Sequence, residues 1–314
     1  MSIYAITGGA GFIGSHLADA LLAQGHDVRI LDDFSTGRME NLDPRCTVMR
    51  ADVCDPAAVR RLLVGAAGCF HLAAVASVVR ATEDWMGAHR VNLGGTIAVF
   101  DAARALGGVP VVYASSAAVY GNLEGLAHED AVPAPRTAYG ADKLGSEQHA
   151  RVGLLVHGVP SMGFRFFNVY GPRQDPSSPY SGVISIFSSL IRAGRPMTLH
   201  GDGSQTRDFV FVSDVVEHLI AGMRHLDDRP GATVLNVCTG RETSVLSLAR
   251  AVGVVSGREP VIVRGAGRAG DIARSVGCPR LATVTLGISA HMALDAGLSA
   301  TLASLAASKS LERV

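Results

Sequence analysis

Short apolar runs alternate with helical segments over the first part of the chain. Continuous apolar runs predict strands at 3–7, 27–31, 46–50, 68–72, 110–115 and 159–166. Apolar residues that recur with the helical period predict helices near 13–24, 56–64, 89–106 and 140–157. Strands without polar alternation are buried on both faces, as in a parallel sheet between two layers of helices. The pattern therefore predicts an α/β fold with a doubly wound parallel sheet of the Rossmann type.

The pattern changes after residue 166. A loop rich in Pro and Ser spans 171–179, and shorter elements follow, with helices near 182–193, 213–226 and 243–256. The Ala- and Ser-rich stretch 298–314 predicts a terminal helix. We therefore expect one domain over 1–166 and a smaller α+β lobe over 167–314, with some segments of the lobe returning to the first domain.

Three glycines, Gly8, Gly11 and Gly14, stand between the first predicted strand and the first predicted helix. A Cβ in this turn would hinder its tight path and keep a phosphate away from the main-chain N–H groups. The helix that follows offers free amides and the positive end of its dipole to a diphosphate. Glycine-rich loops often only turn, but the strand before, the helix after and an acid at Asp32 favour a dinucleotide site. The predicted cofactor contacts in this turn are Gly8, Gly11, Phe12, Ile13 and Gly14.

Ligands of such a sheet bind at the carboxyl ends of its strands. Asp32 and Asp33 end the second strand, where a carboxylate can accept both ribose hydroxyls of NAD and would repel a 2′-phosphate. Asp52 follows the third strand and either meets the adenine or caps the next helix, which the sequence leaves open. Residues after the third and fourth strands complete the predicted cofactor site: Val53, Leu72, Ala73 and Ala74.

Groups suited to acid–base chemistry follow the fifth strand. Ser116 ends this strand, while Tyr139 and Lys143 lie four residues apart on one helix face, so the ammonium can lie near the phenol. A nearby cation favours the ionised phenol, whose ordinary pKa of about 10 is too high for a base at neutral pH. Tyr and Lys at this spacing also occur on ordinary exposed helices. Together with the glycine turn, the pattern predicts Ser116, Tyr139 and Lys143 as catalytic residues.

Composition narrows the expected partners and compartment. The 314 residues are 48% hydrophobic and 18% charged, and 28 basic residues balance 28 acidic ones, so neither nucleic acid nor an anionic membrane is expected as a partner. The five cysteines are odd in number and form no Cys-x-x-Cys pair, which favours a reducing compartment and argues against a framework of disulfides or of cysteine-bound zinc. With no signal-peptide pattern and no apolar run of membrane-spanning length, we expect a cytoplasmic protein.

Taken together, these motifs resemble the extended short-chain dehydrogenase/reductase family and, within it, the UDP-hexose 4-epimerases. The resemblance runs nearly end to end and is carried by 7–14, 32–37, 71–74, 91–92, 115–121, Tyr139 with Lys143, 165–172, 201–203, 207–209 and 268–272. It implies NAD as the cofactor of the domain 1–166, with Asn92, Tyr139 and Lys143 among its contacts. It also implies that the lobe 167–314 binds the UDP-sugar.

The resemblance implies roles for single residues. Tyr139 would be the acid/base, Ser116 its hydrogen-bonding partner, and Lys143 the bridge to the nicotinamide ribose. Asn168, Arg207 and Arg268 would hold the uridine diphosphate, because guanidinium groups match phosphate oxygens, although these arginines could also form surface ion pairs. The full set of implied substrate contacts is Ser116, Asn168, Arg207, Arg268, Asp271 and Ser275.

Two features bear on the branch of the family. Dehydratase relatives carry an Asp-Glu pair directly after the catalytic hydroxyl residue, where this chain has Ala117 and Ala118. Epimerases that accept N-acetylated sugars carry a small residue where this chain has Ser275. We therefore predict NAD-dependent epimerisation at C4 of a UDP-hexose, through a 4-keto sugar. UDP-GlcNAc and UDP-GalNAc are the expected pair, and UDP-Glc and UDP-Gal can enter the same pocket because extra room rarely excludes a smaller substrate.

Three alternatives remain beside this interpretation. Two stay in the family, a UDP-sugar decarboxylase and a nucleotide-sugar reductase, and the third is a non-catalytic NAD-sensing module. Ala117, Ala118 and Ser275 weigh against the first two, and the complete set of Ser116, Tyr139 and Lys143 weighs against the third. The family also suggests a homodimer through the helices at 89–106 and 140–157, although apolar stripes on such helices are usual in a core as well.

Overall fold

A parallel sheet forms the centre of the larger part of the protein. The computed structural model describes residues 1–175, 182–267 and 272–311, and within these ranges seven strands make up this sheet. They are β1 (Ile3–Thr7), β2 (Asp27–Asp32), β3 (Thr47–Arg50), β4 (Gly68–His71), β5 (Val111–Ser116), β6 (Ser161–Phe166) and β11 (Ala232–Val237). Their order across the sheet is β11-β6-β5-β4-β1-β2-β3. The order reverses between β1 and β4, where doubly wound sheets open a crevice for ligands.

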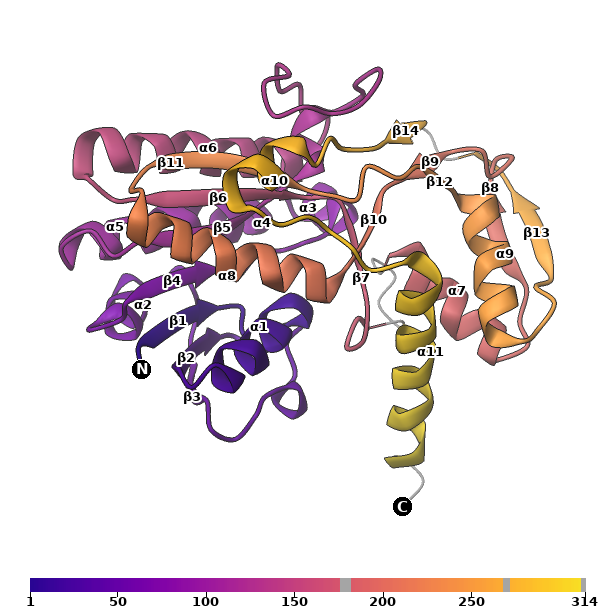
Figure 1. Cartoon of the computed structure of the whole chain (residues 1–314), viewed down its shortest axis with the longest axis horizontal. Helices are drawn as coiled ribbons and strands as arrows, with labels where there is room; N and C mark the ends of the chain where they lie inside the picture. Colours follow the sequence, from indigo (N-terminus) through magenta and orange to yellow (C-terminus); the bar gives the residue numbers. More distant parts are fainter. Residues whose placement is uncertain (176–181, 268–271, 312–314) are drawn as a thin grey trace.

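Helices cover both faces of this sheet (Figure 1). One face carries α1 (Phe12–Ala23) and α8 (Val212–Asp228), and the other carries α2 (Pro56–Leu63), α5 (Gly95–Ala105) and α6 (Ala138–His157). Neighbouring strand residues point to opposite faces, so Ile6 packs with Leu17 and Leu219 on the first face, while Ala5 packs with Leu62 on the second. The predicted α/β fold with a doubly wound parallel sheet is confirmed.

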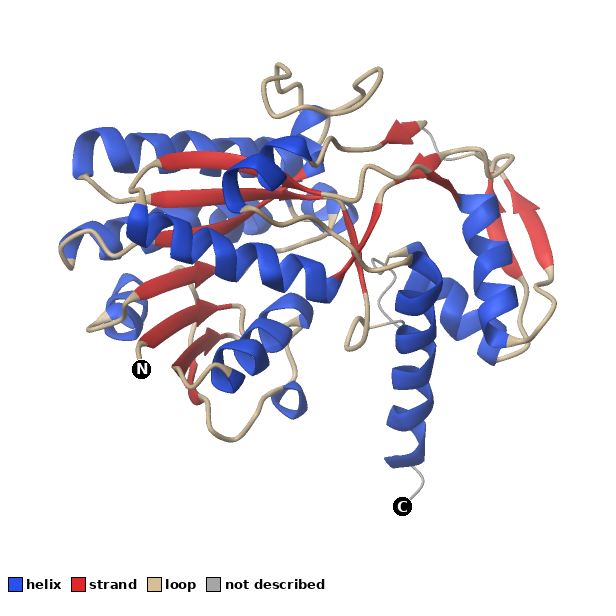
Figure 2. Ribbon diagram, viewed as in Figure 1, coloured by secondary structure: helices blue, strands red, loops and turns tan. Residues whose placement is uncertain are grey.

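A smaller lobe lies beside the sheet, at the right of Figures 1 and 2. Its helices are α7 (Val183–Arg192), α9 (Val245–Ser256) and α11 (Leu294–Leu311). Its strands form short pairings of β8 (Met197–His200) with β13 (Ile262–Gly265), and of β9 (Thr206–Arg207) with β12 (Thr243–Ser244) and β14 (Arg274–Ser275). The short strands β7 (Asn168–Tyr170) and β10 (Phe209–Phe211) pair between this lobe and the main sheet (Figure 2). Phe187, Leu199 and Leu248 are buried in the core of the lobe.

Several short elements depart from the sequence prediction. The single helix predicted at 89–106 is instead α4 (Trp85–His89), the π-helical turn η2 (Arg90–Gly94) and α5 in succession. The elements η1 (Met39–Asn41), α3 (Val78–Glu83), η3 (Ala117–Tyr120) and α10 (Arg280–Leu286) were not predicted. The terminal helix α11 begins at Leu294, four residues before the predicted start at 298.

Two elements from beyond residue 166 are built into the main sheet layers. β11 pairs in parallel with β6, from Ala232 opposite Ser161 to Val237 opposite Phe166, and α8 packs beside α1. The boundary at 166 between a cofactor domain and a substrate lobe stays a prediction. Among the helices of the described ranges, none combines the length and the apolar character needed to cross a membrane.

Candidate active site

A pocket of about 460 Å³ opens where the carboxyl ends of the main strands meet the segment around β7. It lies at the position that the reversal of strand order indicates. The pocket brings together most residues predicted from the sequence to bind the cofactor or to catalyse: Gly8, Gly11, Phe12, Ile13, Gly14, Asp32, Asp33, Asp52, Val53, Leu72, Ala73, Ala74, Ser116, Tyr139 and Lys143. It also includes Asn168, which was predicted to contact the substrate.

The glycine turn has no room for side chains. Gly8 has a φ of +72°, and a Cβ there would lie 2.6 Å from the main-chain nitrogen of Ala73. A Cβ on Gly14 would lie 2.3 Å from the carbonyl oxygen of Gly8. No described side chain caps α1, whose N-cap is Gly11, so its first amides remain free for a ligand. This turn fits the diphosphate of a dinucleotide.

Asp32 lines the pocket at the end of β2. Its Oδ2 accepts a hydrogen bond of 2.9 Å from the N–H of Ala10, and its Oδ1 accepts one of 2.9 Å from the N–H of Phe34. The side chain is buried, and burial raises the pKa of its carboxyl above the usual range although both hydrogen bonds oppose the rise. Each carboxylate oxygen can accept more than one hydrogen bond, so the group can still accept ribose hydroxyls. With the glycine turn, Asp32 fits the adenosine half of NAD.

Asp52 does not cap the following helix, so that alternative is wrong. The cap of α2 is Asp55, which accepts a hydrogen bond of 2.9 Å from the N–H of Ala57. Asp52 instead accepts a hydrogen bond of 2.8 Å from the N–H of Cys54 and pairs with Arg90. It lines the pocket, where the predicted contact with adenine stays a prediction.

Ser116, Tyr139 and Lys143 meet at the end of β5. Lys143 is 3% exposed, its Nζ donates a hydrogen bond of 2.8 Å to the carbonyl of Ala114, and it lies 5.8 Å from the centre of the Tyr139 ring. Burial lowers the pKa of Lys143 to about 8, against an opposing effect of Asp142. The lysine therefore keeps its positive charge at neutral pH.

Without a bound cofactor, the pKa of the Tyr139 phenol is shifted in the direction opposite to the one predicted from the sequence. Burial raises its pKa, and the interaction with Ser116 opposes the rise without cancelling it. The sequence predicts a lowered pKa because of the nearby ammonium, but Lys143 is directed to Ala114 and desolvation is the larger effect. The positive nicotinamide that the prediction also invokes is not part of the chain.

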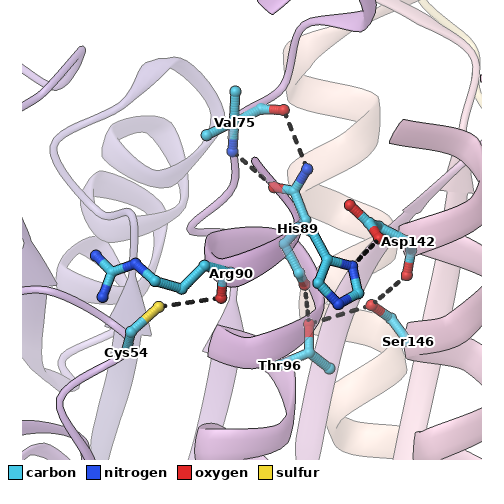
Figure 3. Close-up of polar contacts among 8 residues, drawn as sticks. Cys54, Val75, His89, Arg90, Thr96, Asp142 and Ser146 are labelled. Atoms are coloured by element: carbon cyan, nitrogen blue, oxygen red, sulfur yellow. Dashed lines mark hydrogen bonds and ion pairs between the residues drawn. The ribbon is translucent and has the colours of Figure 1, made fainter. Parts of the chain in front are cut away.

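Asn92 supports the pocket from behind its wall. It is fully buried in η2, where its Oδ1 accepts a hydrogen bond of 2.7 Å from the N–H of Val75 and its amide donates to the Val75 carbonyl. Val75 lines the pocket, whereas Asn92 does not. Beside it, His89 Nδ1 lies 2.7 Å from Asp142 Oδ1, which joins α4 to α6 (Figure 3). In this structure Asn92 positions Val75, so the direct cofactor contact predicted for it stays a prediction.

The predicted substrate contacts of the lobe are only partly brought to the pocket. Asn168 lines it, but Arg207 and Ser275 do not. They lie opposite each other in the β9–β14 pairing, where Arg207 Nη1 donates to the carbonyls of Thr206 at 2.8 Å and Ile272 at 2.7 Å. Arg268 and Asp271 lie outside the described residues. The predicted binding of the uridine diphosphate by Asn168, Arg207 and Arg268 thus stays a prediction.

The pocket also has lining residues to which the sequence alone assigns no contact, although many of them lie in the segments 32–37, 91–92, 115–121 and 165–172 that carry the family resemblance. Ser35 and Thr36 follow the acids at the end of β2, next to Phe34 with its φ of +60°. Their place directly after a strand end was an available signal. Further lining comes from Leu31, Ala51, Val75, Ala76, Val91, Ala114, Ser115, Phe166, Phe167, Val169, Gln174 and Gly182. Phe166, Phe167 and Val169 come from β6 and the chain after it. They lie in the segment 165–172 of the family resemblance, which assigns a contact only to Asn168.

This combination of a glycine turn, a strand-end acid and a Ser, Tyr and Lys set agrees with the comparison to known families. Residues 4–238 match the family described as NAD dependent epimerase/dehydratase. The chain belongs to this family. The family match and its UDP-glucose 4-epimerase relatives together confirm the predicted resemblance to UDP-hexose 4-epimerases, the NAD cofactor and the prediction of an enzyme.

Individual relatives in the family show which reactions are near. The chain is 38% identical over 306 residues to the UDP-glucose 4-epimerase of Mycolicibacterium smegmatis, covering 95% of this chain and 96% of the relative. It is 35% identical over 254 residues to the UDP-N-acetyl-alpha-D-glucosaminuronate decarboxylase of Bacillus cytotoxicus, covering 78% and 77%. The solved UDP-N-acetylglucosamine 4-epimerase of Methanobrevibacter ruminantium has a TM-score of 0.92 at 29% identity, covering 98% of this chain and 99% of that one. Family membership therefore leaves the substrate to be argued from the site.

Proposed function

We propose that this protein interconverts the C4 epimers of a UDP-hexose. UDP-GlcNAc and UDP-GalNAc are the preferred pair, and UDP-Glc and UDP-Gal are also accepted. The observation that carries the proposal is the meeting of Ser116, Tyr139 and Lys143 on the wall of the pocket that the glycine turn and Asp32 close. Relatives that epimerise UDP-glucose and UDP-N-acetylglucosamine support it.

In the proposed reaction, the chain moves one proton and holds the sugar. Tyr139, as phenolate, removes the proton of the sugar 4-hydroxyl and returns it after the sugar has turned its other face. NAD bound in the pocket would supply reversible hydride transfer at C4. Lys143 supplies positive charge that favours the phenolate, because its pKa of about 8 keeps it protonated at neutral pH. Ser116 hydrogen-bonds the reacting oxygen and Asn168 contacts the uridine diphosphate.

The two residues directly after Ser116 favour epimerisation over dehydration. Ala117 and Ala118 begin the turn η3 at this point, and their methyl groups cannot donate or accept the proton that elimination of water requires. Because one relative is a decarboxylase, decarboxylation of a UDP-sugar acid is the second candidate reaction. The experiment therefore includes an acidic sugar.

The test uses the purified protein without added NAD. UDP-GlcNAc, UDP-Glc and UDP-glucuronic acid are incubated separately and followed by proton NMR. We expect UDP-GalNAc and UDP-Gal to form, with a higher kcat/KM for the acetylated sugar. Formation of a UDP-pentose from the acidic sugar, with no epimer from the other two, would replace the proposal by decarboxylation, and conversion of none would overturn it.

The preference for acetylated sugars rests on Ser275 and has its own variants. A Ser275→Tyr substitution places a ring in the space proposed for the acetamido group. We expect it to lower kcat/KM for UDP-GlcNAc by more than about tenfold and to leave UDP-Glc nearly unchanged, since one pocket contact is worth roughly 1–3 kcal/mol. Ser275→Ala is the matched control and should leave both substrates nearly unchanged. If Ser275→Tyr lowered kcat/KM equally for both sugars, Ser275 would not determine the preference for the acetylated substrate.

We also propose a homodimer in a reducing, cytoplasmic setting. Large apolar side chains are exposed on α4 and α6, among them Trp85, Met86, Leu155 and Val156. The five cysteines are free thiols. Light scattering of the eluted protein should give twice the 32.6 kDa mass of one chain, and a Trp85→Glu variant should shift it to the monomer.

A further inference from the structure

Three potential metal ligands lie together at the start of α8, outside the lining of the pocket. Asp214 and Glu217 are three residues apart, so they share one face of the helix. His291 comes from the segment that joins α10 to α11. Its Nδ1 lies 3.3 Å from Asp214 Oδ1 and 3.8 Å from Glu217 Oε2, and one ligand atom of each residue lies within 4.8 Å of the others.

One carboxylate oxygen of Asp214 is buried here without a hydrogen-bond donor among the described residues. Its side chain is 0% exposed, and its Oδ2 accepts a hydrogen bond of 3.1 Å from the N–H of Met292. Its Oδ1 is buried and accepts no hydrogen bond from the described residues. A buried carboxylate oxygen left without a donor or a cation is unfavourable. This is the oxygen that faces His291, so the cluster offers a buried anionic ligand with a free lone pair.

The spacing of the three groups fits one small divalent cation. Zinc binds imidazole nitrogen and carboxylate oxygen at about 2.0–2.2 Å, so two ligands of a tetrahedral ion lie about 3.4 Å apart. The separations of His291 Nδ1 from the two carboxylate oxygens, 3.3 and 3.8 Å, are close to this value, and the two carboxylate oxygens lie within 4.8 Å of each other. An imidazole with two carboxylates suits zinc better than magnesium or calcium, which prefer oxygen ligands throughout.

We propose that Asp214, Glu217 and His291 bind a zinc ion, with water as the fourth ligand. The Glu217 and His291 side chains are 52% and 62% exposed, which leaves the outer side of the ion open to water. The ion would neutralise the buried charge of Asp214 and satisfy its Oδ1. The site is distinct from the pocket because none of the three residues lines it.

The place of the cluster indicates a structural role for the ion. α8 covers the main sheet, whereas the segment with His291 leads into α11, whose Leu298 is buried in the core of the lobe. A zinc ion at this point would fix the start of α11 to the start of α8. We therefore expect zinc to raise thermal stability and to leave the reacting groups untouched.

The experiment measures zinc binding by the untagged, full-length protein after treatment with EDTA, at pH 7.5. Zinc at about a hundred times its dissociation constant should raise the melting temperature by about 4 °C, whereas magnesium should not. His291→Gln and Glu217→Gln should each abolish the rise. His157→Gln, which changes an exposed histidine at the end of α6, is the matched control and should keep it.

A second measurement reports the ligands directly. Cobalt(II) added to the wild-type protein should give the visible absorption of a tetrahedral ion, and His291→Gln should remove it. The competing arrangement is an ion pair in which a protonated His291 bonds both carboxylates without a metal. An unchanged melting temperature of the wild type with zinc would support that ion pair and overturn the site. A zinc effect of full size in both His291→Gln and Glu217→Gln would likewise overturn it, because the ion would then lie elsewhere.

Discussion

The guanidinium of Arg165 donates two parallel hydrogen bonds to the carboxylate of Glu147, Nε to Oε1 at 2.9 Å and Nη2 to Oε2 at 2.8 Å. The two side chains are only 5% and 6% exposed. Ser115, the neighbour of Ser116, donates a hydrogen bond from its hydroxyl to Glu147 Oε1. The pair therefore joins α6, which carries Tyr139 and Lys143, to the ends of β5 and β6.

Removing one partner of this buried pair should be strongly destabilising. Glu147→Ala leaves the charge of Arg165 buried without its carboxylate, so we expect the free energy of unfolding to fall by about 3–5 kcal/mol. Asp101→Ala removes the partner of Arg104 in an exposed pair and should cost less than about 1 kcal/mol. Urea unfolding of both variants measures the difference. Losses of equal size would show that burial does not set the strength of the Glu147 pair.

The proposed acid/base can be tested without disturbing the fold. Tyr139→Phe removes one hydroxyl from the pocket wall, and we expect kcat for epimerisation to fall by about 100- to 10,000-fold. The NAD content and the melting temperature should change little. Tyr4→Phe is the control, since Tyr4 packs on His26 and Phe70 away from the pocket. Retention of wild-type kcat by Tyr139→Phe would exclude the proposed mechanism.

Two glycines in helical conformation should respond in opposite ways to a methyl group. In Gly14→Ala the new Cβ would meet the Gly8 carbonyl at 2.3 Å, so the turn must open and the protein should lose bound NAD. In Gly94→Ala the Cβ meets nothing within 4 Å and φ is −59°, so NAD should be retained and stability should rise by up to about 1 kcal/mol. NAD released by acid, per mole of chain, is the measurement. Equal NAD content in the two variants would contradict the close approach at Gly14.

Lys143 should make stability depend on pH in alkaline solution. Its pKa in the folded chain is about 8, below its ordinary value of 10.5. Between these two values the unfolded chain binds more protons than the folded one, so the contribution of Lys143 to the free energy of unfolding rises with pH. The measurement is urea unfolding of NAD-free protein at pH 7.5 and 9.5. The free energy of unfolding of the wild type, relative to that of Lys143→Met, should be higher at pH 9.5 than at pH 7.5. The opposite trend would mean that the ammonium is stabilised rather than desolvated in its site.

The same titration predicts the reverse trend for activity. Loss of the Lys143 charge removes the cation that favours the Tyr139 phenolate. We expect kcat/KM to decline above pH 8, where Lys143 deprotonates. A steady rise through this range would indicate that the phenol alone controls the rate.

The sequence predicts the first six strands of the sheet well because each is a short run of apolar residues between turn signals. It predicts the glycine turn and Asp32 because their spacing follows from the binding of a diphosphate and a ribose. β11 was missed, since its sequence Ala-Thr-Val-Leu-Asn-Val mixes polar and apolar residues and pairs with a strand some seventy residues earlier. Such a partner cannot be read from local periodicity.

The site was less accessible to prediction where it depends on packing. The roles of Asn92 behind the pocket wall and of Lys143 at the Ala114 carbonyl follow from three-dimensional contacts. The pKa of Tyr139 depends on how deeply the ring is buried, which spacing on a helix does not indicate. The cluster at Asp214 joins residues from two segments that no motif connects.

The position of β11 has a consequence for synthesis on the ribosome. Until Val237 has emerged, β6 has no neighbour on its outer side, and its main-chain groups form an open edge. The apolar surface that Leu219 of α8 covers is exposed for much of the same period. A nascent chain paused near residue 166 would thus present both an unpaired strand and an uncovered sheet face, which are the features that chaperones recognise in incomplete proteins.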